Sequence, residues 1–324
     1  MSKLNIFMLG GTGFVGRSLA ARLAEDGHQI TVISRRRERH RELLVLPTLN
    51  IVNGDVHDSQ VLLDQFKGVD VVINLVGILN ERGRDGKGFH RVHVELPEKI
   101  AKACVAKGVS RLLHMSALNA DTNGPSHYLR TKGMGEDLVH GASNSRFQVT
   151  SFRPSVIFGR DDSFTNRFAD LLRRIPWMFP LACPNARFQP IYVDDVAEAF
   201  VRSLQDTQTF GQRYNLCGPE TYSLVEIVTY IASLIGVKRH IIKLSPWQSK
   251  LQANVLERVP GKPFSIDNFQ SLQIDSVCPN GFPKAFGLAP RSLEEIAPGY
   301  LGSGEDTLSR FRRQAGRGDR VQSS

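Results

Sequence analysis

Short apolar runs alternate with longer helical segments through the first half of the chain. The runs are rich in β-branched residues and stay apolar at consecutive positions, which is typical of strands that helices cover on both faces. Gly27 and Gly108 follow two of the helical segments, at the position where helices commonly end. The pattern predicts strands at Asn5–Leu9, Gln29–Ser34, Leu49–Asn53, Val69–Leu75, Arg111–Met115 and Gln148–Phe152, and helices at Phe14–Glu25, Ser59–Phe66, Val94–Lys107 and Tyr128–His140.

Repeated strand–helix units of this kind predict an α/β fold with a doubly wound parallel sheet, a Rossmann fold. After Arg153 the chain is richer in Pro, Gly and polar turn formers, before "FQPIYVDDVAEAFVRSL" returns to a strand and a helix. Ser223 and Glu226 form the capping-box pattern of a further helix. The region from Trp247 to Pro298 is less regular, and Gly, Ser, Arg and Asp dominate from Leu301 onward.

This change of character predicts a division of the chain into three parts. We expect residues 1–160 and about 189–218 to form the Rossmann domain, and about 161–188 and 219–300 to form a smaller C-terminal substrate or partner region that caps it. Residues 301–324 are expected to be a disordered basic tail. The apolar segment "LLRRIPWMFPLACP" in the smaller region could cap an apolar substrate, dock on a membrane or a partner, or pack as core.

A glycine-rich turn lies directly between the first predicted strand and the first predicted helix. In "NIFMLGGTGFVGRSLAARLAEDG", Gly10, Gly13 and Gly16 are spaced G-x-x-G-x-x-G. A tight turn and a close backbone approach both exclude a Cβ atom, and the N-terminus of the helix then offers free N–H groups to a pyrophosphate. Because the motif stands at the first strand–helix junction of an α/β chain, it predicts a dinucleotide-binding site.

The residues after the second predicted strand indicate which dinucleotide binds. An NAD site usually places a carboxylate there to bind the ribose 2′-hydroxyl, whereas this chain has Ser34, Arg35 and Arg36. An arginine at this position suits a 2′-phosphate. We therefore expect NADP(H) to be preferred, with NAD(H) as the alternative. The basic loop could instead simply face water.

Other candidate contacts follow the later strands, where ligands of such sheets bind. Asp55 follows the third strand and is placed to meet the adenine, and small or apolar residues end the fourth and sixth strands. The full set of expected cofactor contacts is Gly10, Thr12, Gly13, Phe14, Val15, Gly16, Ser34, Arg35, Arg36, Asp55, Val56, Leu75, Val76, Gly77, Lys132, Pro154, Ser155 and Val156.

The stretch "YLRTKGMGE" places the phenol of Tyr128 and the ammonium of Lys132 four residues apart. On a helix these positions share one face, so the two polar groups can point to one spot. A tyrosine is a poor base at neutral pH, and an adjacent ammonium favours its phenolate form. The pair could transfer protons, or it could belong to an ordinary surface helix.

The ordered set of glycine turn, "NLVG" strand end, Ser116 and YxxxK resembles the short-chain dehydrogenases/reductases of the extended and atypical type. The resemblance implies that Tyr128 exchanges a proton with the substrate oxygen, that Lys132 binds the nicotinamide ribose and lowers the pKa of Tyr128, and that Ser116 is the third catalytic residue. Ser126 is the weaker alternative for that third role, and His93 stands where relatives often carry Asn.

Within that superfamily, "SALNADTNGPSHYLRTKGMGE", "RPSVIFGRDDSFTNRFA", "QPIYVDDV" and "GPETYSLVEIV" resemble the NADPH-binding accessory subunit of respiratory complex I and its bacterial relatives. The resemblance implies tightly held NADP(H), a peripheral membrane location, a membrane respiratory complex as partner, and a structural or assembly role. The alternative is an active NADP(H)-dependent reductase, dehydrogenase or epimerase of a small carbonyl, sugar-nucleotide or quinone-like substrate. A third possibility is a soluble NADP(H)-sensing regulator, but such relatives generally lack YxxxK, so the presence of the motif counts against it.

The composition of the chain argues against several classes of binding partner. The net charge is +9, with basic residues concentrated in "SRRRERHR" and "SRFRRQAGRGDR", but no motif for binding nucleic acid accompanies them. The four cysteines are widely spaced without CxxC, which argues for a reducing compartment and against a disulfide framework or a zinc site. No cluster of metal ligands, secretory signal or membrane-spanning run is recognisable, so we expect no metal and a cytoplasmic protein, peripheral to the cytoplasmic face of the inner membrane if it meets a membrane.

Overall fold

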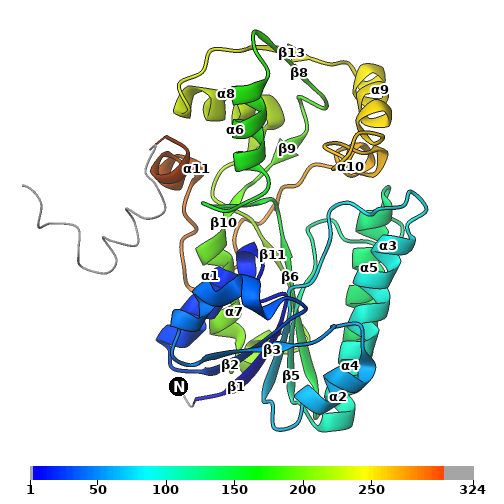
Figure 1. The fold of residues 1–324 in the computed structure, drawn as a ribbon, viewed down its shortest axis with the longest axis vertical. Coiled ribbons are helices and arrows are strands. Elements are labelled where there is room, and N and C mark those ends of the chain that lie inside the picture. Colours follow the sequence, from blue (N-terminus) through cyan, green and yellow to red (C-terminus); the bar gives the residue numbers. More distant parts are fainter. Residues whose placement is uncertain (1–2, 303–324) are drawn as a thin grey trace, which may run out of the picture.

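Seven parallel strands form the central sheet of the computed structural model, which describes residues 3–302 (Figure 1). Their order is β11-β6-β5-β4-β1-β2-β3. The predicted doubly wound Rossmann fold is therefore confirmed. The strands are β1 (Asn5–Leu9), β2 (Gln29–Ser34), β3 (Leu49–Asn53), β4 (Val71–Asn74), β5 (Arg111–Met115), β6 (Gln148–Pro154) and β11 (Arg213–Leu216).

Helices cover both faces of this sheet because alternate side chains of each strand point to opposite sides. Ile6 and Met8 of β1 pack with α1 (Phe14–Glu25) and α7 (Val193–Ser203), whereas Phe7 and Leu9 pack on the other face. That second face is covered by α2 (Ser59–Gln65), α4 (Leu96–Lys107) and α5 (His127–Gly141). Each strand is thus buried on two sides, which accounts for the unbroken apolar runs in the sequence.

The helix expected at Val94–Lys107 begins differently from the prediction. Helix α3 (Lys87–His90) and a π-helical turn at Arg91–Glu95 lead directly into α4. A Cβ atom at Gly135 of α5 would lie 1.7 Å from the carbonyl oxygen of His93. The wide π turn therefore fits against a glycine on the neighbouring helix, a close contact between backbones that periodicity cannot reveal.

A third core cluster lies beyond the carboxyl ends of the strands and includes Phe179, Leu181 and Ile227 (Figure 1). The predicted capping box at Ser223 and Glu226 is confirmed. The elements of this part are β7 (Ile157–Phe158), α6 (Thr165–Arg174), β8 (Met178–Leu181), β9 (Arg187–Phe188), β10 (Ile191–Tyr192), β12 (Tyr222–Ser223), α8 (Leu224–Leu234), β13 (His240–Lys243), α9 (Pro246–Leu256), α10 (Ile266–Ser271) and α11 (Leu293–Ile296).

Two expectations for the C-terminal region need correction. Helix α9 is regular over eleven residues, although it buries only Ser249 and Ala253 and so lacks an inward apolar stripe that the sequence could show. Leu301 was expected to begin the tail, but it is buried in the third cluster. The remainder of the expected tail, from residue 303 onward, lies outside the described residues. No helix within residues 3–302 has the length and apolar character needed to cross a membrane.

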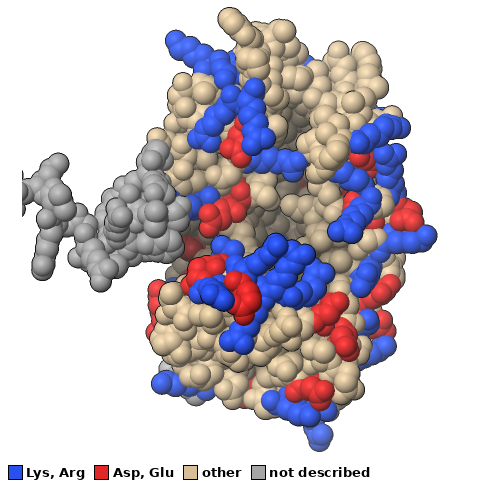
Figure 2. Space-filling model, in the orientation of Figure 1, with Lys and Arg blue, Asp and Glu red and all other residues tan. Residues whose placement is uncertain are grey.

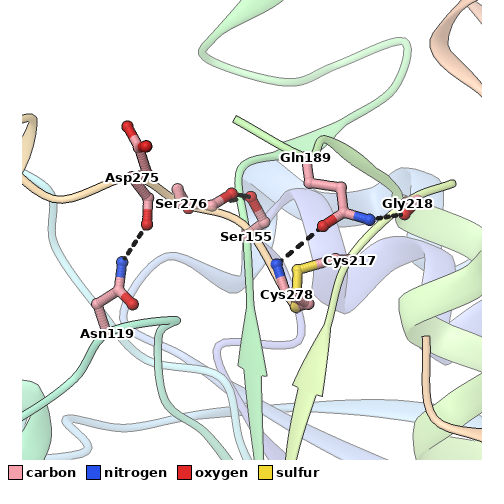
Figure 3. Close-up of a disulfide and its surroundings, with 8 residues drawn as sticks. All are labelled: Asn119, Ser155, Gln189, Cys217, Gly218, Asp275, Ser276 and Cys278. Atoms are coloured by element: carbon pink, nitrogen blue, oxygen red, sulfur yellow. Dashed lines mark hydrogen bonds between the residues drawn. A yellow bond between two sulfur atoms is a disulfide. The ribbon is translucent and has the colours of Figure 1, made fainter. Parts of the chain in front are cut away.

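The prediction that the cysteines form no disulfide is wrong, because Cys217 and Cys278 are bonded (Figure 3). Cys217 follows β11, and Cys278 lies 61 residues further along the chain. Gln189 connects the two segments, since its amide donates to the Gly218 carbonyl and accepts from the Cys278 N–H. A pairing over this separation leaves no local spacing signal, so cysteine spacing gives no evidence on the redox compartment.

Candidate functional site

Two adjoining cavities lie at the carboxyl edge of the sheet, with volumes of about 960 Å³ and about 520 Å³. Figure 2 shows the hollow that they form across the middle of the molecule. Gly10, Gly77 and Ile78 line both cavities. The larger cavity also meets Thr12, Ser34, Arg35, Arg36, Asp55, Val56 and Val76, and the smaller one meets Gly13, Phe14, Val15, Gly16, Leu75, Ser116, Tyr128, Lys132, Pro154, Ser155 and Val156. Every expected cofactor contact, together with Ser116 and Tyr128, therefore lines one cavity or the other.

The glycine turn lies where the two cavities meet. Gly10 has a φ of +82°, and its carbonyl accepts a hydrogen bond from the Gly13 N–H at 3.0 Å. A Cβ atom at Gly16 would lie 2.4 Å from the same carbonyl oxygen, so any larger residue would push α1 away. Gly13 precedes α1 without a side chain that could cap it. The N–H groups of the first helical turn are thus open to an anion.

The larger cavity is rich in arginine. Arg35 and Arg36 follow β2 and are joined by Arg82 and Arg91, which the sequence analysis did not identify. Figure 2 shows Lys and Arg side chains gathered directly below the hollow. Arg82 and Arg91 come from the segment after β4, where no local pattern distinguishes a ligand-facing arginine from a solvated one. The cavity therefore suits a ligand that carries phosphate groups.

Two carboxylates also line this cavity, but the backbone occupies much of their hydrogen-bonding capacity. The Asp55 carboxylate accepts from the N–H of His57 at 3.0 Å, which holds it at the turn after β3. The buried Glu81 carboxylate accepts from the N–H groups of Gly86 and Gly88, both at 2.8 Å. Glu81 thus shapes the loop after β4, and the four guanidinium groups dominate the charge that a ligand would meet.

The smaller cavity has a different chemical character. Of the described residues that line it, Lys132 is the only charged one. Most of the others are apolar, and several come from the C-terminal part of the chain, including Phe164, Phe188, Leu272 and Ile274. Ser276 also lines it, and the Ser155 hydroxyl donates to the Ser276 carbonyl at 2.8 Å (Figure 3). The neighbouring disulfide thus ties this wall to the sheet.

The ammonium of Lys132 is buried on α5 beside the end of β5. It donates to the Met115 carbonyl at 3.0 Å, and burial lowers the pKa of Lys132 to about 8. A Cβ atom at Gly77 would approach this ammonium to 3.2 Å. The absence of a side chain at Gly77 therefore leaves the ammonium room at the junction of the two cavities.

Tyr128 lies one helical turn before Lys132 and packs edge-on against His93, with ring centroids 5.5 Å apart. Burial and the nearby Asp267 carboxylate raise the pKa of Tyr128 to about 12. Asp267 accepts from the N–H groups of His127 and Tyr128 at 2.6 and 3.2 Å. The pKa of Tyr128 is therefore raised, in contrast to the lowering by Lys132 that the sequence led us to expect. Asp267 was missed because it comes from α10, in the region that looked irregular.

The serine candidates are both engaged in hydrogen bonds. The Ser116 hydroxyl donates to the fully buried Glu136 at 2.8 Å, and Arg153 donates to both oxygens of that carboxylate at 2.9 Å. Ser126 caps α5 by accepting from the Leu129 N–H, and it does not line either cavity. Tyr128 is therefore the phenol or hydroxyl best placed to meet a ligand beside Lys132.

His93 packs against Tyr128 and lies close to Lys132. Its Nε2 accepts from the Ile78 N–H at 3.1 Å, so Nδ1 carries the proton and donates to the Thr131 hydroxyl. Burial, Lys132 and His114 lower the pKa of His93 to about 2, which keeps its ring neutral. Within residues 3–302, no group of three or more His, Cys, Asp or Glu side chains is arranged to hold a metal ion.

Known proteins resemble this chain in sequence and in fold. The NAD dependent epimerase/dehydratase family matches residues 6–217. NADH dehydrogenase (ubiquinone) 1 alpha subcomplex subunit 9, mitochondrial, of Mus musculus is 30% identical over 298 residues, covering 89% of this chain and 77% of that protein. Ceramide reductase of Caulobacter vibrioides is 31% identical over 242 residues, covering 74% and 73%. The solved structure of MoeE5 in complex with UDP-glucose and NAD shares the fold, with a TM-score of 0.71 at 19% identity over 96% of this chain and 99% of that one.

The lowered pKa of Lys132 predicts a pH-dependent stability. Between pH 8 and 10.5 the unfolded lysine is protonated while the buried one is not, so the unfolded state binds more protons and stability rises with pH. Replacing Lys132 with Met should remove up to about 1.4 kcal/mol per pH unit of this rise. Urea unfolding of both proteins from pH 7.5 to 10, without nucleotide, measures the difference. Parallel pH profiles would contradict a neutralised Lys132.

Proposed function

The chain belongs to the NAD dependent epimerase/dehydratase family, and we propose that it binds NADP(H) along the carboxyl edge of its sheet. The observation that carries the proposal is the continuity of the two cavities across the glycine turn, with Gly10 and Gly77 lining both. A dinucleotide has the matching shape, since its pyrophosphate can lie on the N-terminus of α1 with one nucleoside on each side. In this proposal residues 1–160 and 189–218 bind the cofactor, and 161–188 and 219–300 complete the substrate side.

A preference for NADP(H) over NAD(H) follows from the charge of the larger cavity. Arg35 and Arg36 occupy the place where a carboxylate would select the ribose 2′-hydroxyl. Arg82 and Arg91 line the same cavity and add to its positive potential. A 2′-phosphate at this place could contact guanidinium groups from the segments after β2 and after β4. NAD(H) has no 2′-phosphate, so these guanidinium groups would not be paired with it.

We expect Arg35→Glu to weaken NADPH binding while changing NADH binding little. A charge-assisted hydrogen bond contributes on the order of 1.5–3 kcal/mol, so the NADPH dissociation constant should rise about 10- to 150-fold. Fluorescence titration of both reduced cofactors measures the effect. Arg37→Glu is the matched control, because Arg37 is exposed in the same basic run but does not line the cavity. Equal loss in both variants, or tighter NADH binding by the wild type, would contradict the assignment.

The smaller cavity is proposed to hold the reacting end of the cofactor together with a substrate carbonyl. NADP(H), when bound, supplies or accepts the hydride. Tyr128 is protonated at neutral pH, and its raised pKa keeps it so under more alkaline conditions, which suits a proton donor to the carbonyl oxygen during reduction. Lys132 of α5 donates to the Met115 carbonyl at the end of β5 and offers its remaining N–H donors to the cavity.

The lining of the smaller cavity also favours one substrate class. A nucleoside diphosphate sugar would require cations for its phosphates, but Lys132 is the only charged residue among the described ones that line this cavity. Phe164, Phe188 and Leu272 offer an apolar wall instead. We therefore propose an uncharged, apolar carbonyl substrate. The relative named ceramide reductase supports this choice over a sugar nucleotide.

Replacing Tyr128 with Phe should abolish reduction of the substrate carbonyl without weakening the binding of NADPH. A general acid contributes about 10²–10⁴-fold to the rate, so NADPH oxidation by a long-chain 3-oxoacyl ester should fall by at least about 100-fold, with the NADPH dissociation constant unchanged. Lys132→Ala should lose turnover and also bind NADPH more weakly. Absorbance at the NADPH band follows the reaction, with UDP-glucose as the comparison substrate. Full turnover by Tyr128→Phe would show that Tyr128 is not the proton donor.

A second candidate function is a non-turnover NADP(H)-binding accessory or assembly subunit of a membrane respiratory complex. The 30% identity to the mitochondrial subunit over 89% of this chain favours it. The engagement of the Ser116 hydroxyl with Glu136 favours it too, because a catalytic serine would need that hydroxyl for the substrate. In this case the protein would work on the cytoplasmic face of the inner membrane, would co-purify with respiratory subunits, and would leave NADPH unoxidised with every carbonyl offered.

A further inference from the structure

Large apolar side chains are exposed mainly at one end of the molecule. Of the thirteen that are exposed within residues 3–302, seven lie in two short segments, 177–178 and 242–259. Both tryptophans of the chain are among them, Trp177 with 83% and Trp247 with 67% of its surface exposed. We call these seven residues the apolar rim: Trp177, Met178, Ile242, Trp247, Leu251, Val255 and Val259.

The first part of the rim stands on the ribbon formed by β8 and β13. Trp177 precedes β8 with a φ of +65°, a backbone conformation that residues with a Cβ atom rarely adopt. Its carbonyl accepts from the His240 N–H at 2.9 Å, which fixes the turn. In the paired strands Pro180 stands beside Ile242. The fold therefore holds a large indole outward on a fixed turn, although Phe179 and Leu181 of the strand that follows it are buried in the core.

The second part of the rim runs along α9. Trp247, Leu251 and Val255 are four residues apart and form one exposed stripe, whereas the inward face of the helix is made of Ser249 and Ala253. Polar contacts attach α9 to the rest of the fold: the Ser249 hydroxyl accepts from the Cys183 N–H, and the Gln252 amide donates to the Pro180 carbonyl. These contacts also make α9 a neighbour of the ribbon (Figure 1). An amphipathic helix normally buries its apolar stripe, and this one presents it outward.

Charged residues around the rim are mostly basic. Within residues 170–181 and 236–260, the acidic residues are Asp170, which pairs with Arg173, and Glu257, which lies 3.8 Å from Arg84. The basic residues of the same segments are Arg173, Arg174, Lys238, Arg239, Lys243, Lys250 and Arg258, and all but Arg239 are exposed. Lys250 lies on α9 beside the apolar stripe, and Arg258 follows two residues after the helix ends. The surface thus complements a partner that is apolar inside and anionic at its edge.

We propose that the apolar rim docks on an anionic phospholipid bilayer. Tryptophan favours the boundary between headgroups and acyl chains, and the surrounding Lys and Arg side chains are attracted to acidic headgroups. A helix with an outward apolar stripe and flanking cations has the form of interfacial membrane helices. The proposal goes beyond cofactor binding and does not depend on it, because none of the rim residues lines either of the two cavities at the sheet edge.

The two tryptophans make the test direct, because they are the only ones in the chain and both lie in the rim. The full-length protein is mixed with vesicles of phosphatidylcholine alone or with phosphatidylglycerol. With the anionic vesicles we expect a blue shift of tryptophan emission, quenching by brominated acyl chains, and flotation with the vesicles that weakens as salt is raised. Little change is expected with phosphatidylcholine alone.

Matched variants separate the rim from other routes to the membrane. Leu251→Ser with Val255→Ser should weaken vesicle binding by about tenfold or more, because less apolar surface is then buried. Val45→Ser, an exposed apolar position outside the rim, should leave binding unchanged. Flotation without a blue shift or quenching would mean that another part of the chain binds lipid. A blue shift that depends on protein concentration without vesicles would mean that a second copy covers the rim. Either result, or no binding, overturns the proposal.

Discussion

The carbonyl of Gly10 lies so close to Gly16 that no side chain fits between them, and this contact fixes where α1 begins relative to β1. The contact aims the open N–H groups of the first helical turn at the edge of the sheet, where the other strands also end. The two cavities meet at this turn because Gly10 and Gly77 leave the space between them free. Because both cavities lie at this edge, one ligand can contact the arginines on one side of the turn and Tyr128 and Lys132 on the other.

The cleft is chemically unequal on the two sides of the glycine turn. Four guanidinium groups line the larger cavity, whereas Lys132 is the only charge among the described residues that line the smaller one. Burial lowers the pKa of Lys132 to about 8 and raises that of Tyr128 to about 12. At neutral pH Tyr128 is therefore neutral, and Lys132 still carries its proton but releases it more readily than an exposed lysine. If an anionic cofactor lay across the turn, the arginines of the larger cavity would neutralise its phosphate charge. The smaller cavity would remain largely apolar, which suits an uncharged carbonyl substrate.

The sequence could predict the parts of this structure that local pattern controls. The strands β1, β2, β3 and β5 and the helix α1 have the predicted bounds, because their apolar periodicity and the glycine turn are local signals. The expected cofactor contacts line the two cavities, since strand ends of a parallel sheet converge on one edge. Helix α9 was missed because it buries only small residues, and the Cys217–Cys278 disulfide because its partners are 61 residues apart. Arg82 and Arg91 reach the larger cavity, and Asp267 reaches the backbone of Tyr128, through tertiary folding alone, which leaves no mark on the neighbouring sequence.

The central claim is that one dinucleotide spans the glycine turn in a single orientation. A crystal structure of the protein with NADPH bound tests this claim most directly. The account predicts the 2′-phosphate in contact with Arg35 or Arg36, the pyrophosphate on the first turn of α1, and the nicotinamide beside Tyr128 and Lys132. NADPH bound in the reverse orientation, or outside the two cavities, would contradict it.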